Sequence, residues 1–251
     1  MNEILSHISK LNDTDRAAAY VADRALRTAC YAVMNPAKAT ERAQLAAALA
    51  EAFQATVTPE PPAKEPDKKM EPHPKHDERT RNMLLRFLAD VGTQAEVPAI
   101  AGVLGELNLR EMARYALQAI GGTAATTALI GTLEACGPEF RIGVINTLAD
   151  LGGADAAAAI RAAAKDADTD VRIAAIEALA ALGDPANDAI IAKACDGRRV
   201  KVTKRAMKAR LRLAANLAEQ GNAAAAKRIY EALARTDTPQ AKAAKLALKQ
   251  H

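Results

Sequence analysis

The sequence predicts an all-α protein in which antiparallel helix pairs stack on one another as an α-solenoid. Three observations predict it: alanine makes up about a quarter of the 251 residues, aromatic residues only 3%, and an internal repeat recurs about every 30 residues. Alanine is the best helix former and a poor strand residue, which argues against all-β and doubly wound α/β folds. A repeat of this length is typical of helical units that bury their apolar faces only against their neighbours.

The repeat aligns on four glycines, each of which follows an apolar helical segment. The glycines are Gly92, Gly121, Gly152 and Gly183. Leucine stands four residues before each of them, at Leu88, Leu117, Leu148 and Leu179, and an apolar residue stands eight after, at Ile100, Leu129, Ile160 and Ile191. Together with apolar residues eight and one before the glycine, these spacings indicate a first helix, a turn and a second helix. The glycine fits the left-handed position that ends a helix.

One unit carries the resemblance to a known family. Its residues Asp170–Leu179, with the sequence DVRIAAIEAL, precede Leu182-Gly183-Asp184, and this pattern is similar to a short HEAT repeat of the kind first described in phycobilisome lyase-type proteins. Residues Leu211–Arg235 are partly similar to a tetratricopeptide hairpin. Both resemblances imply the same architecture, a right-handed, armadillo/HEAT-like superhelix.

Four segments are predicted along the chain. They are a divergent N-terminal helical capping pair (1–57), a proline-rich linker or loop (58–76), four HEAT-like repeats (77–196), and a basic C-terminal helical pair plus a last helix (197–251). The capping helices are expected over 13–34 and 36–55, and the last helix over 239–250. The linker assignment follows from its prolines, which cannot continue a helix.

The net charge of +4 conceals an uneven distribution. Residues 193–251 carry 15 basic and 4 acidic side chains, whereas residues 1–192 carry 19 basic and 26 acidic ones. The cations between 198 and 212 recur every three or four residues, so they form a stripe on one helix face beside an apolar stripe. Such a row of like charges costs stability unless a partner neutralises it. The residues predicted to bind a partner are Arg199, Lys201, Lys204, Arg205, Lys208 and Arg212.

Three interpretations of this stripe stay open: a solvated helix face that keeps the protein soluble, a site for an acidic protein surface, and a nucleic-acid site. We expect a non-catalytic scaffold or adaptor that recognises a protein along the concave face formed by the second helices, with the stripe providing electrostatic steering. The alternative is a nucleic-acid-binding module that uses the same helix, although no aromatic side chain interleaves the stripe to stack on bases.

The arginines eleven residues before each repeat glycine are expected to stabilise the stack of repeats. They are Arg81, Arg110, Arg141 and Arg172, and three of them have a polar residue two positions earlier: Asn108, Glu139 and Asp170. Stacking of the repeats brings such groups together, so we expect a ladder of ion pairs that sets the register of the stack.

No catalytic residues, metal site, cofactor or small-molecule substrate is predicted. His73 and His76 lie in the proline-rich segment, which lacks the supporting groups that orient metal ligands. The resemblance leaves a HEAT-like enzyme of the bilin-lyase or DNA-glycosylase type as the least favoured function. Resemblance to such glycosylases implies a cleft that contains tryptophan, but this sequence has no tryptophan.

The expected location is the cytoplasm. Cys30, Cys136 and Cys195 are far apart and odd in number, so they cannot make a complete disulfide framework and are expected to be reduced thiols. We expect no membrane span, because no stretch of 18 or more apolar residues occurs. We expect no secretory signal either, because residues 1–10 lack a basic start followed by an apolar stretch.

Overall fold

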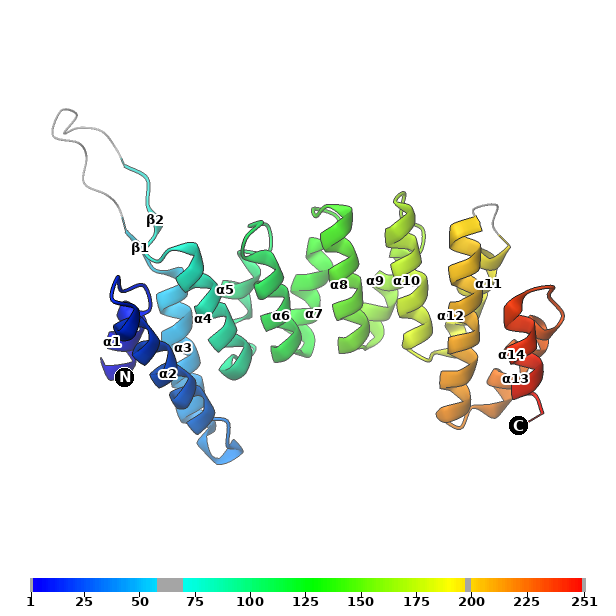
Figure 1. Cartoon of the computed structure of the whole chain (residues 1–251), viewed down its shortest axis with the longest axis horizontal. Helices are drawn as coiled ribbons and strands as arrows, with labels where there is room; N and C mark the ends of the chain where they lie inside the picture. Colours follow the sequence, from blue (N-terminus) through cyan, green and yellow to red (C-terminus); the bar gives the residue numbers. More distant parts are fainter. Residues whose placement is uncertain (1, 58–69, 197–199, 250–251) are drawn as a thin grey trace. The chain divides into compact units, whose positions relative to one another are not determined.

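The computed structural model describes residues 2–57, 70–196 and 200–249 (Figure 1). Within these residues the chain is helical apart from its connecting turns and one short two-stranded ribbon, so the all-α solenoid class is confirmed. The chain divides into two compact units, Met1–Leu129 (unit 1) and Ile130–His251 (unit 2). Each unit is a stack of helices joined by short turns.

Unit 1 begins with three helices before the first repeat. Its elements are α1 (Asn2–Lys10), α2 (Arg16–Ala32), the 3-10 turn η1 (Pro36–Lys38), α3 (Ala39–Gln54), β1 (Thr56–Val57), β2 (His73–Pro74), α4 (Glu78–Val91), α5 (Val97–Ala101), α6 (Arg110–Ile120) and α7 (Gly122–Thr132), whose last residues belong to unit 2. Helix α1 packs on α2, α3 packs on α4, and α4 packs on α6. Helices are therefore present at both positions where the capping pair is expected, as α2 and α3.

Two elements of unit 1 were not predicted. Helix α1 is short; Ile8 within it and Leu11 directly after it are buried. The ribbon pairs Thr56 with Pro74 and Val57 with His73 in antiparallel register, so the described end of the proline-rich segment is held against the end of α3. Residues 58–69 of that segment lie outside the described residues.

Unit 2 contains the later repeats and the basic C-terminal helices. Its elements are α8 (Pro138–Leu151), α9 (Ala154–Ala163), α10 (Thr169–Ala181), the 3-10 turn η2 (Pro185–Asn187), α11 (Asp188–Cys195), α12 (Val200–Glu219), α13 (Ala223–Ala234) and α14 (Pro239–Ala247). The first helices of successive pairs, α8, α10 and α12, pack side by side in one layer, with α9 and α11 behind them (Figure 1). Helix α13 packs against α12 and α14.

The core lies where the repeat predicts it. All four leucines before the repeat glycines and all four apolar residues of the second helices are 0% exposed. Removing one such side chain from water contributes on the order of 2 kcal/mol, so each of these eight positions helps to hold the helices together.

The repeat glycines end their helices in two different ways. Gly121 and Gly152 have φ of 66° and 69° with ψ near −160°, and Gly183 has φ of 65°, so the positive φ expected at these positions is confirmed. The same expectation is wrong for Gly92, whose φ is −58°. A Cβ atom at Gly92 would clash with the backbone oxygen of Leu88 and would lie 2.7 Å from the Cδ1 atom of Ile120. Steric crowding at the end of α4, rather than a positive φ, therefore requires glycine there.

Candidate partner-binding surface

The basic segment folds as α12 because apolar residues recur on one side of it. The buried side chains are Val202, Ala206, Ala209, Leu213, Ala214 and Leu217, at the helical spacing of three or four residues. They face α10, α11 and α13, against which α12 packs. The opposite side of the helix is left to the charged residues.

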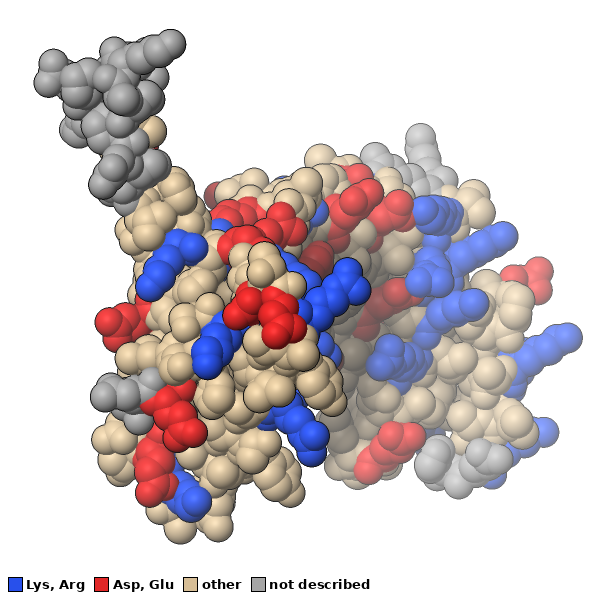
Figure 2. All heavy atoms as spheres, turned by 60° about the vertical axis from the view of Figure 1, so that its left-hand side comes forward, with Lys and Arg blue, Asp and Glu red and all other residues tan. Residues whose placement is uncertain are grey.

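The basic face of α12 consists of Lys201, Lys204, Arg205, Lys208 and Arg212, all of which are exposed. Of the residues predicted to bind a partner, only Arg199 is missing from this face, because it lies outside the described residues. In the space-filling view, Lys and Arg side chains dominate the right-hand part of the surface, where the C-terminal helices of unit 2 lie (Figure 2).

Two of these five cations are neutralised by the preceding repeat. Lys201 forms a salt bridge with Asp170, and Arg205 forms one with Glu177, both on α10. In the second pair Arg205 Nε lies 2.6 Å from Glu177 Oε1. The sequence contains the signal for both pairs, because they join residues 31 and 28 positions apart, close to one repeat length.

The other three cations are not neutralised in this way. Lys204, Lys208 and Arg212 are spaced four residues apart, and none of them forms a salt bridge with a described residue. At a rise of about 1.5 Å per residue, the row is about 12 Å long. Like charges at this spacing repel one another and destabilise a helix. We call Lys204, Lys208 and Arg212 the open row.

Arg210 belongs to the same basic run but has a different role. It lies on the side of α12 that meets α11, where its Nε and Nη2 atoms are 2.6 and 3.0 Å from the two carboxylate oxygens of Asp188. Hydrogen bonding to Asp188 raises the pKa of Arg210 in spite of partial burial. Arg210 therefore joins two helices and is not part of the exposed face.

The position of the open row differs from the expected recognition surface. The sequence predicts recognition along the second helices, but α12 stacks on α10 in the layer of first helices. The charged stripe therefore lies on the first-helix side of unit 2, and the second helices do not carry it.

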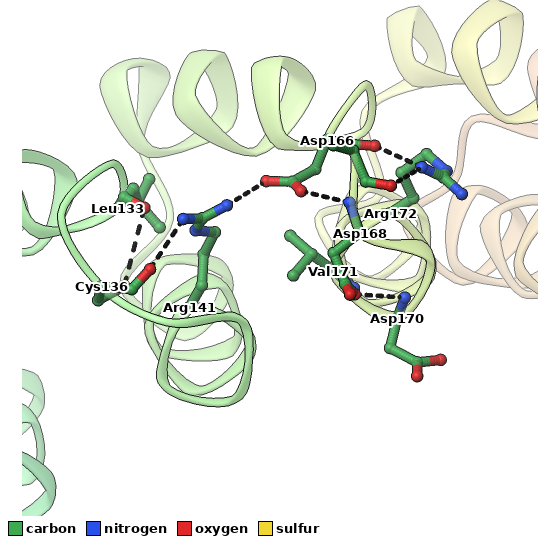
Figure 3. A network of polar contacts seen from close by, with 9 residues as sticks. Leu133, Cys136, Arg141, Asp166, Asp168, Asp170, Val171 and Arg172 are labelled. Atoms are coloured by element: carbon green, nitrogen blue, oxygen red, sulfur yellow. Dashed lines mark hydrogen bonds and ion pairs between the residues drawn. The ribbon is translucent and has the colours of Figure 1, made fainter.

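Two of the repeat arginines form contacts between neighbouring repeats. Arg141 on α8 reaches the loop before α10, where its Nη1 lies 2.6 Å from Asp166 Oδ2, and the other oxygen of Asp166 accepts the N–H of Asp168 (Figure 3). In unit 1, Arg81 contacts Glu106 in the same way, at 2.7 Å. These two arginines make the expected contacts between neighbouring repeats, but their partners are the loop residues Glu106 and Asp166, 25 positions later, and not the residues two positions before the next repeat arginine.

The residues two positions before the arginines make other contacts. Asn108 donates to Glu78 at 2.7 Å, and Asp170 accepts the hydrogen bond from Lys201. Arg172 donates to the backbone oxygens of Asp166 and Ala167, which closes the loop on itself (Figure 3). The described contacts are therefore of several kinds and do not form the expected ladder between the repeat arginines and the residues two positions before them.

Charge pairing shifts the titration of the Arg141–Asp166 pair. Burial acts to raise the pKa of Asp166, but the N–H of Asp168 and the guanidinium of Arg141 outweigh it, so this pKa lies below its ordinary value. The hydrogen bond to Asp166 raises the pKa of Arg141. Both groups are ionised at neutral pH and form a charge-assisted contact.

An open hollow of about 480 Å³ lies beside this pair in unit 2. Its lining is mostly small and apolar, and Arg141 and Asp166 on its wall are bonded to each other. Within the described ranges, no group of three His, Cys, Asp or Glu side chains is placed to hold a metal ion. None of the described helices is both long enough and apolar enough to cross a lipid bilayer.

Comparison with known proteins gives one family match, over part of the chain. Residues 126–212 match the family described as HEAT repeats, and no curated protein matches the chain significantly. Similar solved structures include a chain of the CpcE–CpcF complex of phycocyanin lyase from Nostoc sp. PCC7120, with a TM-score of 0.45 and 19% identity over 98% of this chain and 94% of that one. Human deoxyhypusine hydroxylase in complex with glycerol has a TM-score of 0.38 and 14% identity over 99% and 95%. A designed armadillo repeat protein in complex with a (KR)4 peptide has a TM-score of 0.35 and 18% identity over 98% of each chain.

Proposed function

We propose that this chain, whose residues 126–212 are HEAT repeats, is a non-catalytic adaptor that holds an acidic segment of a partner protein on the basic face of α12. The observation that carries the proposal is the open row: Lys204, Lys208 and Arg212 are exposed, evenly spaced and without a carboxylate partner among the described residues. A helix that keeps three like charges in a row gains stability from any ligand that neutralises them.

The spacing of the row supports an extended acidic segment. Residues four apart on a helix lie about 6 Å apart along its axis. In an extended peptide, side chains on the same face are two residues apart, which is about 6.6 Å. Alternate Asp or Glu residues of an extended segment therefore match Lys204, Lys208 and Arg212 one to one. Attraction over this distance also accelerates encounter with an acidic partner.

A binding assay with a synthetic peptide tests the proposal. The probe is a fluorescein-labelled peptide of alternating Glu and Ser, titrated with the full chain at low and at physiological salt. We expect the triple variant Lys204→Glu, Lys208→Glu, Arg212→Glu to weaken binding at least tenfold. The matched control reverses three exposed lysines of unit 1, at Lys10, Lys38 and Lys75, and keeps the same net charge as the triple variant. An equal loss of affinity in both variants would show a nonspecific charge effect and contradict the proposal.

The same assay distinguishes an acidic protein partner from a nucleic-acid partner. Each phosphate contact with duplex DNA contributes about −0.9 to the slope of log affinity against log salt concentration. We expect a random DNA duplex to bind more weakly than the peptide at physiological salt. Tighter binding of the duplex, with a slope of about −3 that disappears in the triple variant, would replace the adaptor proposal with a nucleic-acid-binding one.

The proposal includes a reducing, cytoplasmic location. Cys30, Cys136 and Cys195 are all free thiols, and the first and last of them are buried in the helix packing. Free cysteines in this arrangement suit a compartment in which thiols stay reduced.

A further inference from the structure

Helix α2 carries an exposed stripe of three arginines and two tyrosines. Its inner side buries Ala22, Leu26 and Cys30, where it packs in unit 1. The stripe lies on its outer side and consists of Arg16, Tyr20, Arg24, Arg27 and Tyr31. At 3.6 residues per turn, these five side chains fall within about 80° of the helix circumference.

The two tyrosines are unusually exposed for aromatic residues. Tyr20 is 65% exposed and Tyr31 is 81% exposed, although the chain has only 3% aromatic residues. Arg16 and Arg24 form no salt bridge with a described residue. Tyrosine and arginine are the side chains enriched at the centres of protein interfaces, where lysine and glutamate are depleted. The stripe contains neither lysine nor glutamate, in contrast to the basic face of α12.

We propose that two copies of this chain pair through α2 in antiparallel orientation about a two-fold axis. In such a contact, residue i of one copy meets residue j of the other and residue j meets residue i, so every facing pair has the same sum of residue numbers. The stripe obeys this rule: Arg16 faces Tyr31 of the second copy and Tyr20 faces Arg27 of the second copy, and both sums are 47. Arg16 and Arg27 therefore each meet the ring of a tyrosine, which is an attractive cation–π contact.

The centre of the stripe is complementary as well. With the same sum, Arg24 faces Asp23 of the second copy. The Asp23 carboxylate, which also accepts from Arg27 of its own helix, thus gives Arg24 of the second copy an acceptor next to the axis. A parallel arrangement instead places each arginine against the identical arginine of the second copy. Charge complementarity thus favours the antiparallel pairing over the parallel one.

Arg27 is held in place before the second copy arrives. Its Nε and Nη2 atoms lie 2.8 and 3.0 Å from the two carboxylate oxygens of Asp23. Its guanidinium carbon lies 5.8 Å from the centre of the Phe87 ring on α4, while half of its side chain stays exposed. A guanidinium fixed by one ring offers its other side to Tyr20 of the second copy at little cost in side-chain entropy.

The contact involves one helix from each copy, so its area falls at the low end for specific interfaces. We therefore expect a reversible dimer with a dissociation constant on the order of tens of micromolar. This dimer does not depend on the open row of α12, which lies in the other unit.

Sedimentation velocity of the full chain tests the dimer. From low-micromolar to several hundred micromolar protein, we expect the average mass to rise from 26.4 kDa toward twice that value. The Tyr20→Ala, Tyr31→Ala double variant is expected to weaken the dimer at least tenfold. Tyr115→Ala is the control, because Tyr115 is also exposed in unit 1 but lies on α6. A monomer at all concentrations, or a dimer that the double variant leaves unchanged, would overturn the proposal.

Chemical cross-linking tests the orientation. In a parent protein with Cys136→Ser, the Arg16→Cys and Tyr31→Cys variants are treated with a short bis-maleimide, alone and mixed. Antiparallel pairing brings position 16 of one copy to position 31 of the other, so only the mixture is expected to cross-link efficiently. Efficient cross-linking of each variant alone, without a gain on mixing, would show a parallel contact and contradict the proposed register.

Discussion

Arg205 of α12 and Glu177 of α10 form a two-point ion pair, with Nε 2.6 Å from Oε1 and Nη2 3.0 Å from Oε2. This pair binds α12 to the preceding repeat and removes one positive charge from the surface offered to a partner. Lys201 does the same through Asp170. The basic face of α12 is therefore divided between cations that serve the fold and the open row of Lys204, Lys208 and Arg212, which is available to a ligand.

This division predicts different stability effects for two arginines of one helix. Arg205→Gln is expected to lower the free energy of unfolding by less than about 1 kcal/mol, because the Arg205 pair is largely exposed. Arg210→Gln is expected to cost about 1.5–3 kcal/mol, because Asp188 is then left partly buried without its charged donor. Urea unfolding of the two variants measures the difference. Equal losses in the free energy of unfolding would show that burial does not make the Arg210–Asp188 pair more stabilising than the Arg205–Glu177 pair.

The Arg141–Asp166 contact predicts a loss of stability in acid. The pKa of Asp166 is lowered in the folded protein, so the carboxylate stabilises the fold above its ordinary pKa of about 3.9, and this contribution is lost as the pH falls below that value. Asp166→Asn is expected to lower stability at pH 7 and to reduce the further loss between pH 4 and pH 2. Urea unfolding across this range tests it, with the exposed Asp237→Asn as control. The expectation fails if Asp166→Asn and Asp237→Asn have the same pH profile.

The turn at Gly152 predicts a backbone effect. Its φ of 69° with ψ of −159° is a conformation that almost only glycine adopts, so Gly152→Ala is expected to cost about 1–3 kcal/mol although nothing lies within 4 Å of the added Cβ. Gly131→Ala is the control, because Gly131 lies within α7 without a positive φ and also has open space. That variant is expected to be neutral or to gain up to about 1 kcal/mol. Thermal unfolding compares them, and a harmless Gly152→Ala would contradict the strained turn.

The environment of the thiols predicts their reactivity. Burial raises the pKa of Cys30 to about 12 and that of Cys195 to about 11, so neither is a thiolate at neutral pH. Cys136 is only half-buried. We expect a maleimide to label Cys136 first in the native protein, and Cys30 and Cys195 only in denaturant. Peptide mass spectrometry measures the order, and early labelling of Cys30 would show that α2 opens readily.

Much of the fold could be predicted from patterns among residues that are close together in the sequence. The repeat leucines and the helix pairs were predicted because helical spacing and the turn glycine are local signals. Helix α1 was missed because it is short and its burial depends on other helices. The conformation of Gly92 was predicted wrongly because its place after a helix matches that of the other repeat glycines, and part of the crowding around it comes from Ile120, 28 positions away.

The candidate surface shows the same limit. The charge pattern identified every described cation of the basic face, because i, i+4 spacing alone places them on one side of a helix. It did not show which cations stay available, since Asp170, Glu177 and Asp188 reach α12 only when the repeats stack.

By itself, the sequence determined that the chain is a stack of helix pairs and that its last quarter presents a positive helix face, because both follow from spacings that recur within one repeat or from one repeat to the next. Only the tertiary structure decided which charges neutralise one another, in which layer the basic face lies, and that α2 leaves two tyrosines uncovered. Those outcomes depend on side chains that meet across repeats, at distances set by packing rather than by order in the chain.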